Sequence, residues 1–206
     1  MGVQQWIGSR RGAKQERKDM AQWRERGFAA PSPPFIKREV LARHSAPQAT
    51  WVETGTFQGD TTAFLAERAR KVISIEPEPA LYAAAAARFR DRPNVELHAG
   101  LSEQVMPGVL KALSGDVRFW LDGHYSAGIT HKGPKDTPIV DELALIGAAL
   151  PAWGQVAVLV DDVRCFEPTN PEFADYPSRD FLVHWAVQHR LNWTIEHDIF
   201  VASNFR

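Results

Sequence analysis

The 206-residue sequence contains a single cysteine, Cys165, and no long apolar run. One thiol cannot form an intrachain disulfide or a zinc site built from cysteine pairs, which excludes disulfide-held secreted folds and zinc fingers. No segment approaches the roughly 20 apolar residues of a membrane-spanning helix, and the opening MGVQQW leads into a basic stretch without the apolar block of a signal peptide. We therefore expect a cytoplasmic protein with no membrane partner.

A strong excess of one charge is also missing, because 24 Lys and Arg face 25 Asp and Glu, a formal net charge of −1. This balance argues against a nucleic-acid partner. The charge is nevertheless uneven, since residues 1–43 are net basic and the remainder is net acidic. We expect residues 1–30 to form a basic N-terminal arm, which the Pro31-Ser32-Pro33-Pro34 cluster ends, and residues 31–206 to form a single domain.

From Thr50 onward, short apolar runs alternate with helix-like segments, the rhythm of βα units in a parallel sheet. The strand candidates are Thr50–Glu53, Lys71–Glu76, Val95–Ala99, Val117–Asp122, Val156–Asp161, Trp193–Glu196 and Ile199–Ser203. The helix candidates are 33–46, 61–70, 80–90, 102–114, 137–150 and 179–189. The fold class is therefore α/β, a doubly wound, mostly parallel sheet of about seven strands with helices on both faces. The last two strands form an antiparallel hairpin at the sheet edge, and the last strand is antiparallel to the rest.

Ligands of such sheets bind off the carboxyl ends of the strands. The first strand ends in Glu53 and turns through Gly55 and Gly59 into a helix, so that the backbone can approach a ligand closely. It is neither G-x-G-x-x-G nor a phosphate-binding P-loop. The second strand ends in Glu76, and an acid there can accept hydrogen bonds from both hydroxyls of a ribose. Ser102, after the third strand, could contact a purine edge or cap a helix.

The fourth and fifth strands end in Asp122 and in the pair Asp161-Asp162. Carboxylates this close repel one another, so they are separated, share a proton or are bridged by a cation, and hard oxygen ligands favour Mg²⁺. Successive strand residues point to opposite faces, so both members of the pair can face one site only where the strand has already turned.

The series of strand endings resembles class I S-adenosylmethionine (SAM)-dependent methyltransferases, most nearly the catechol O-methyltransferase and macrocin O-methyltransferase group. Five elements in order carry the resemblance: Glu53-x-Gly55-x-x-x-Gly59-x-Thr61, Ile-Ser-Ile-Glu76, Gly100-x-Ser102, Leu-Asp122 and Val-Asp161-Asp162. The resemblance covers about residues 50–165. It implies a Rossmann-like fold and an enzyme that transfers a methyl group from SAM.

The resemblance also implies roles for individual residues. The cofactor-binding set would be Glu53, Gly55, Thr56, Gly59, Asp60, Thr61, Glu76, Pro77, Ser102, Glu103 and Asp122. The metal ligands would be Asp122, Asp161 and Asp162, holding Mg²⁺. One departure is that Tyr125 stands where catechol methyltransferases have a lysine base, three residues after the first metal aspartate.

With that lysine missing, His124 is the candidate base, although it could equally be a structural or adenine-contacting histidine, and Asp122 is the second catalytic residue. The segment 126–136 has the composition of a mobile lid. Tyr125, His131, Lys132 and Arg164 are the candidate contacts to the acceptor, although Arg164 could equally form a surface ion pair. We expect O-methylation of a hydroxyl on a small molecule or sugar.

Two other functions remain open at this stage. A nicotinamide-dependent enzyme could use the same fold, but the glycine triplet and a Tyr-x-x-x-Lys pair are missing. A binding protein could keep the fold without catalysis. The oligomeric state is also open, and a homodimer is one candidate.

Overall fold

The structure, a computed structural model, describes residues 10–123 and 137–205. Its centre is a sheet whose strand order is β3-β2-β1-β4-β5-β7-β6. Strands β1 (Thr50–Thr54), β2 (Lys71–Glu76), β3 (Val95–Ala99), β4 (Val117–Leu121) and β5 (Val156–Val160) are parallel to one another. Strand β7 (Ile199–Ser203) lies antiparallel between β5 and β6 (Asn192–Glu196). The predicted fold class is confirmed, including the antiparallel hairpin at the edge.

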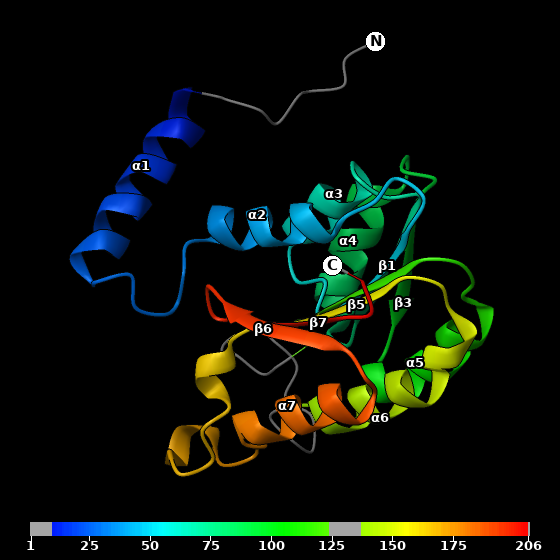
Figure 1. Cartoon of the computed structure of the whole chain (residues 1–206). Coiled ribbons are helices and arrows are strands. Elements are labelled where there is room, and N and C mark those ends of the chain that lie inside the picture. The colour runs from blue at the N-terminus through cyan, green and yellow to red at the C-terminus, as the bar shows by residue number, and fades with distance from the viewer. Residues whose placement is uncertain (1–9, 124–136, 206) are drawn as a thin grey trace.

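Two layers of helices cover the sheet, as Figure 1 shows. One face carries α2 (Pro34–His44), α3 (Asp60–Ala66) and α4 (Pro79–Phe89), and the other carries α5 (Ser102–Ala112), α6 (Ile139–Ala149) and α7 (Arg179–Gln188). Short 3₁₀ turns at Leu150–Ala152, Val163–Cys165 and Pro171–Phe173 complete the connections. The central strands β1, β4 and β5 are buried along their whole length, as expected for strands covered on both faces.

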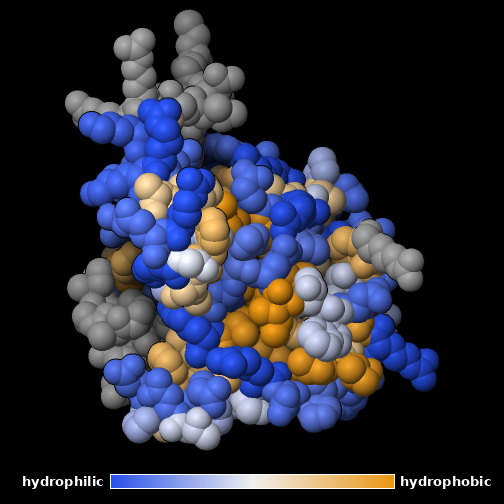
Figure 2. Space-filling model, turned by 60° about the vertical axis from the view of Figure 1, so that its left-hand side comes forward, coloured by the Kyte–Doolittle hydropathy of each residue, from blue (hydrophilic) through white to orange (hydrophobic). Residues whose placement is uncertain are grey.

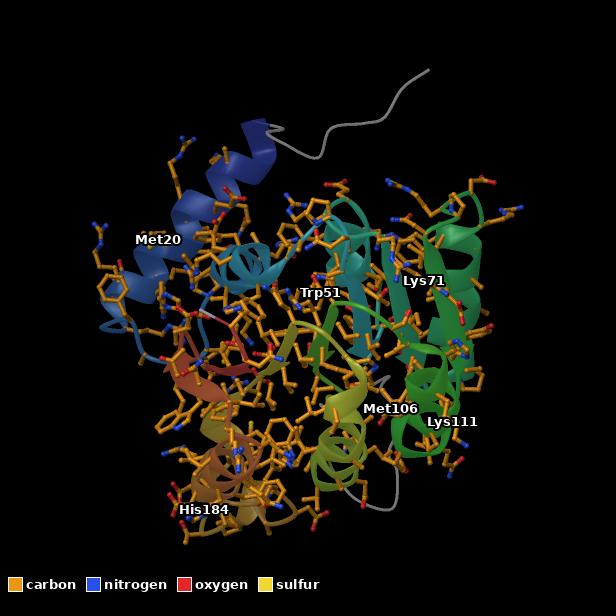
Figure 3. All side chains as sticks on the ribbon, turned by 45° about the vertical axis from the view of Figure 1, so that its right-hand side comes forward. Met20, Trp51, Lys71, Met106, Lys111 and His184 are labelled. Atoms are coloured by element: carbon orange, nitrogen blue, oxygen red, sulfur yellow. The ribbon has the colours of Figure 1, made fainter. Side chains whose placement is uncertain are left out.

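The alternation of strand side chains divides the core into two apolar clusters. Val52, Phe119 and Val158 pack on the α5–α7 side, whereas Trp51 and Trp120 pack on the side of α2 and α3. Trp51 is fully buried and lies in the interior of the molecule in Figure 3. The two clusters fix the sheet between its helical layers, and the carboxyl ends of the parallel strands are therefore held at one edge.

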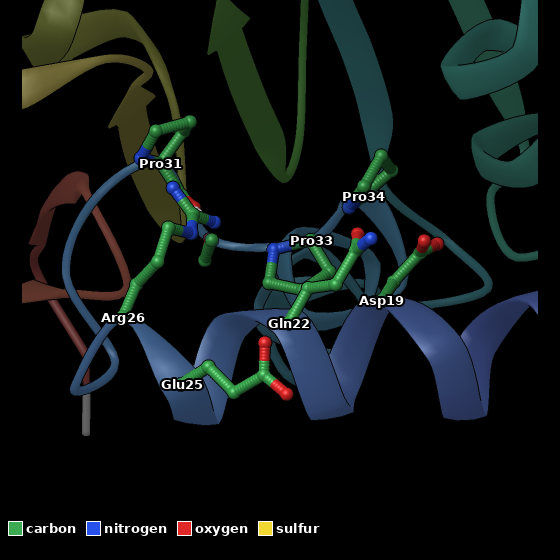
Figure 4. A pocket seen from close by; sticks show the side chains of 8 residues that line it. Asp19, Gln22, Glu25, Arg26, Pro31, Pro33 and Pro34 are labelled. Carbon is green, nitrogen blue, oxygen red and sulfur yellow. Dashed lines mark hydrogen bonds between the residues drawn. The ribbon is translucent and has the colours of Figure 1, made fainter.

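Helix α1 (Arg10–Glu25) projects from the rest of the molecule (Figure 1). It is anchored at its carboxyl end, where the buried Trp23 donates a hydrogen bond to the Ala29 carbonyl and packs edge-on against His197 in the β6–β7 turn. Ser32 donates to the His197 carbonyl instead of capping α2, which begins after Pro33. A hollow of about 580 Å³ separates the end of α1 from the proline cluster, and Figure 4 shows Asp19, Gln22, Glu25 and Arg26 on its helical side.

Element boundaries differ from prediction by a few residues. Helix α3 ends at Ala66 rather than at residue 70, and β4 and β5 end one residue before Asp122 and Asp161. No helix among the described residues is long and apolar enough to span a bilayer. The molecular face in Figure 2 is mostly hydrophilic with an apolar area within it, and exposed apolar side chains include Val187 of α7 and Trp193 and Ile195 of β6.

The loop between β1 and α3 packs closely against the end of α4. Gly59 has φ +79°, and a Cβ there would lie 2.6 Å from Cε2 of Phe89 at the end of α4. Gly59→Ala should therefore lower the free energy of unfolding by about 1–3 kcal/mol, as measured by urea denaturation.

Gly108→Ala is the matched control. This glycine lies within α5, and its added methyl group would meet no heavy atom within 4 Å among the surrounding residues. The control should be neutral or stabilising by about 0.5–1 kcal/mol. Equal effects of the two substitutions would contradict this account of the loop.

Candidate functional site

The carboxyl ends of β1 and β4 mark the point where the strand order reverses. The chain runs outward from β1 through β2 to β3 and then returns to β4 on the other side of β1. Open α/β sheets bind ligands outside this reversal. Here the two loops touch, because a Cβ on Gly55 would lie 2.6 Å from the Asp122 carbonyl oxygen. Gly55 has φ +84°, so only glycine fits this approach without strain.

Glu53, the fourth residue of β1, is completely buried at this reversal. Its Oε2 accepts hydrogen bonds from the hydroxyls of Thr62 and Ser74, and Ser74 also pairs with Thr56 at 2.6 Å. Burial raises the pKa of Glu53 to about 7 against the lowering effect of these hydroxyls, and the charges of Asp122 and Glu76 raise it further. Its Oε1 is buried and has no hydrogen-bond partner among the described residues.

Glu76, the last residue of β2, faces the same loop. Its Oε2 accepts the backbone N–H of Phe57 at 2.8 Å and its Oε1 accepts that of Glu78 at 2.9 Å. The carboxylate is only 4% exposed. These two amides fix its orientation at the sheet edge while the remaining lone pairs of both oxygens stay available.

A third buried acid, Glu142 of α6, reaches the site from the opposite helical layer. Burial raises its pKa to about 7, while the hydroxyls of Ser102 and Thr54 lower it. Glu142 lines a small cavity of about 10 Å³ together with Gly123, Asp161 and Tyr176. This is about the space of one water molecule.

The acidic cluster, defined here as Asp122, Asp161 and Asp162, follows β4 and β5 with carboxylate oxygens within 4.8 Å of one another. Asp162 has φ +55°, so the chain has left the strand and both members of the pair face the same side. Lys37 of α2 enters this cluster: its Nζ lies 2.6 and 2.7 Å from the two oxygens of Asp161 and 2.8 Å from Oδ1 of Asp162.

The cations inside the cluster set its charge balance. Burial and the neighbouring Asp122 and Asp162 raise the pKa of Asp161. Burial alone would lower the pKa of Lys37, but Asp161 and Asp162 outweigh it and raise that pKa. Arg164 donates to both oxygens of Asp162, at 2.5 and 3.0 Å, and also pairs with Asp198 in the β6–β7 turn. Lys37 and Arg164 therefore stay charged, and together they occupy every carboxylate oxygen of Asp161 and Asp162.

The cluster consequently fits a Mg²⁺ ion poorly, although its oxygen ligands are of the right type. At an effective dielectric constant of 20, unit charges 4 Å apart interact by about 4 kcal/mol, so the Lys37 ammonium would cancel about 8 kcal/mol of the attraction between the carboxylates and a divalent ion. A Mg²⁺ ion would also have to displace both cationic side chains from Asp162.

The cofactor side of the site, unlike the acidic cluster, does fit the group that the resemblance implies. Oε1 of Glu53 is buried and has no hydrogen-bond partner among the described residues, so a ligand could supply one. The Gly55 turn and the Glu76 carboxylate, oriented by two backbone amides, lie at the same edge. These residues fit a nucleoside cofactor, which brings hydroxyl and amino groups as hydrogen-bond partners.

Other predicted site residues are placed as follows. Thr61, Pro77, Ser102 and Glu103 lie in the loops or first helical turns after β1, β2 and β3. Asp60 is exposed and accepts a hydrogen bond from Arg88, and Gly59 packs on Phe89. Arg164, a predicted contact to the acceptor, instead forms ion pairs with Asp162 and Asp198, and an ion pair was the alternative for this residue. His124, Tyr125, His131 and Lys132 lie outside the described residues.

Sequence reasoning missed Thr62, Ser74, Glu142 and above all Lys37. Ser74 precedes Glu76 by two residues and therefore points to the same face, which is a signal that could have found it. Lys37 stands in a basic stretch of sequence beside Arg38 and has no local signature. The available clue was the charge argument, because three close carboxylates require a cation and the expected lysine after Asp122 is missing.

No family model matches the chain. It is 33% identical over 98 residues to the protein named "Probable ribosomal RNA small subunit methyltransferase A" of Methanosarcina mazei, covering 44% of this chain and 36% of the relative. A relative from Methanosarcina acetivorans carries the same name. The chain thus spans about a third or less of the length of the curated relatives it matches.

Solved structures that share the fold include two methyltransferases. An O-methyltransferase from Bacillus cereus, in complex with S-adenosylhomocysteine (SAH), is 15% identical with a TM-score of 0.55, covering 91% of this chain and 88% of its own. An rRNA methylase from Streptococcus thermophilus is 15% identical with a TM-score of 0.50, covering 85% and 97%. The chain has the fold of class I SAM-dependent methyltransferases. The finer resemblance to the catechol and macrocin O-methyltransferase group is not confirmed.

The expected partners require a correction. Overall charge balance argued against nucleic acid, and the resemblance to O-methyltransferases implied a small-molecule acceptor, but the curated relatives are named as rRNA methyltransferases. Net charge failed as a guide because it averages a basic N-terminal segment with an acidic remainder. The charge on each part of the surface is the relevant quantity.

The buried Glu53 predicts a dependence of stability on pH. Because its pKa in the folded chain is about 7 and its ordinary value is 4.5, the folded state holds the proton more tightly. Stability should therefore fall as pH rises from about 4.5 to about 7, on the order of 3 kcal/mol from this group. In urea denaturation at a series of pH values, Glu53→Gln should remove the loss of stability that comes from Glu53. The loss that comes from Glu142, whose pKa is also raised to about 7, should remain.

The surface variant Glu172→Gln serves as the control and should leave the wild-type pH dependence unchanged. A Glu53→Gln profile parallel to that of the wild type would show that Glu53 is not held protonated.

Proposed function

We propose that the chain binds SAM at the carboxyl ends of β1, β2 and β4 and transfers its methyl group to an acceptor. The observation that carries the proposal is the buried Glu53 Oε1, which has no hydrogen-bond partner in residues 10–123 and 137–205, with the oriented Glu76 carboxylate at the same edge. The methyltransferase fold and the methyltransferase names of the relatives support it.

SAM supplies a methyl group on a positively charged sulfonium. In the proposed arrangement Glu76 accepts hydrogen bonds from the ribose hydroxyls, since its orientation is already fixed by the Phe57 and Glu78 amides. Glu53 is held by Thr62 and Ser74, and its Oε1, which has no partner among the described residues, faces a hydrogen-bonding group of the cofactor. Ser102 and Glu103 begin α5 next to the place where the base would lie.

Catalysis at such a site comes mainly from positioning the acceptor in line with the methyl group and from removing its proton. His124, adjacent to Gly123, remains the proposed base, with Asp122 holding the loop. No magnesium-dependent step is included, because Lys37 already supplies a positive charge to the acidic cluster.

We further propose RNA as the acceptor class. The names of the curated relatives suggest it, and α1 offers phosphate contacts through the exposed Lys14, Arg17 and Lys18. Basic side chains on a projecting helix can contact the phosphates of RNA even though the net charge of the whole chain is close to zero. Mass spectrometry of the modified nucleoside would identify the acceptor atom, and oxygen is one of the possible results.

Cofactor binding is tested by calorimetric titration of the full chain with SAH. We expect micromolar binding, weakened about 10- to 100-fold by Glu76→Ala, because that variant loses charged hydrogen bonds to the ribose. Glu96→Ala is the matched control: this acid lies in β3 and pairs with Lys71 and His98. The control should bind SAH as the wild type does.

Circular dichroism would establish that each variant is folded. Absence of SAH binding by folded wild-type protein would overturn the proposal, and binding of NADH instead would favour a nicotinamide enzyme. SAH binding without methyl transfer to any acceptor would favour a binding protein that uses the same fold.

The acceptor class is tested with RNA. Replacing Lys14, Arg17 and Lys18 together by Ala should weaken RNA binding and reduce the slope of log K against log salt by about 2, at about 0.7 per lost phosphate contact. SAH affinity should not change. Arg90→Ala with Arg92→Ala, two exposed arginines near α4, is the control and should leave the slope unchanged. Methyl transfer to no RNA under conditions where SAH binds would refute this acceptor class.

A further inference from the structure

The Lys37 ammonium lies inside the acidic cluster rather than on its rim. Its nitrogen contacts three carboxylate oxygens at 2.6–2.8 Å, and its side chain is only 16% exposed. The contacting oxygens belong to Asp161 and Asp162, which lie 124 and 125 residues after Lys37 in the sequence. This is the arrangement of a cation enclosed by its ligands, with nitrogen in place of a metal.

We propose that Lys37 is the resident cation of the acidic cluster and that it keeps divalent metal ions out of it. The proposal does not depend on the methyltransferase activity, since it concerns only what the three carboxylates bind. Lys37 supplies a cation to three aspartates that the resemblance drawn from the sequence had assigned to Mg²⁺.

The backbone around Lys37 fixes this position. Helix α2 begins with Pro34 directly after Pro33, whose carbonyl accepts the N–H of Ile36 and that of Lys37, so Lys37 lies in the first turn. One turn later Val40 and Leu41 are buried against β1 and β5 residues of the core. The helix therefore cannot slide away from the sheet edge without exposing these side chains, and the lysine is held at the cluster.

One further cation, Arg164, faces the cluster from a neighbouring element, and one hydrogen bond lies within the cluster. Arg164 approaches Asp162 from the 3₁₀ turn after β5, and the backbone N–H of Asp162 donates to Oδ1 of Asp161 at 2.8 Å. Arg164 has a second partner in Asp198, so it is divided between two carboxylates. Asp161 has no such arginine among the described contacts, and Lys37 is its cationic partner.

Removal of the ammonium should convert the cluster into a metal site. Without Lys37, oxygens of Asp122, Asp161 and Asp162 would still lie within 4.8 Å of one another, and much of their negative charge would be uncompensated. Clustered carboxylate oxygens are the ligands that hard divalent ions prefer. Mn²⁺ is the probe of choice because its paramagnetism reports binding directly.

The test is titration of metal-stripped full-length protein with Mn²⁺, followed by electron paramagnetic resonance. Wild-type protein should show no binding below millimolar Mn²⁺, and Lys37→Met should bind at least tenfold more tightly, in the micromolar range. Arg38→Met is the matched control, since it removes the adjacent, half-buried cation of the same helix. It should behave as the wild type does.

Two more variants separate a cation effect from a structural one. Lys37→Arg keeps a positive charge and should continue to exclude Mn²⁺. Lys37→Met combined with Asp161→Asn should lose the acquired binding, because a carboxylate ligand is gone. Mn²⁺ should also raise the melting temperature of Lys37→Met but not that of the wild type.

The proposal is overturned if wild-type protein binds Mn²⁺ as tightly as Lys37→Met does, or if a folded Lys37→Met gains no affinity. Should Lys37→Met fail to fold in metal-free buffer, the same titration is made on Lys37→Gln, which keeps a hydrogen-bond donor without the charge. A Lys37→Gln protein that is folded and binds no Mn²⁺ would equally overturn it.

Discussion

The constraint on which the site depends is the burial of carboxylates at one edge of a parallel sheet. Glu53, Glu76, Glu142, Asp161 and Asp162 are all at most 7% exposed, and they come from strands, helices or strand ends that converge there. A buried carboxylate is costly unless hydrogen bonds, cations or protonation compensate its charge. The neighbouring loops and helices are arranged to provide that compensation.

The compensation differs on the two sides of the point where the strand order reverses. Around β1 and β2 it comes from hydroxyls and backbone amides, which leave lone pairs free for a ligand. After β5 it comes from the charged side chains of Lys37 and Arg164, which occupy the oxygens they contact. One side is therefore suited to bind a cofactor, and the other is electrostatically closed to added cations.

The sequence was sufficient to predict the sheet, because each strand is a short apolar run ended by a turn residue and each helix begins close to the expected position. It also placed Glu53, Glu76, Asp122 and Asp161 at one edge, since parallel strands carry their carboxyl ends to the same side. The partners of these acids were harder to predict. Lys37 lies more than 120 residues from Asp161, and such contacts have no period or motif that a single sequence displays.

The β6–β7 hairpin ties the last strands of the chain to the charge balance of much earlier residues. Strand β7 pairs with β5, and the turn before it carries Asp198 to Arg164 and His197 to Trp23. Local opening of this sheet edge would take one of its two acids from Arg164 and would remove a contact that holds the carboxyl end of α1. Fraying of the last two strands would therefore disturb the acidic cluster and the projecting helix together.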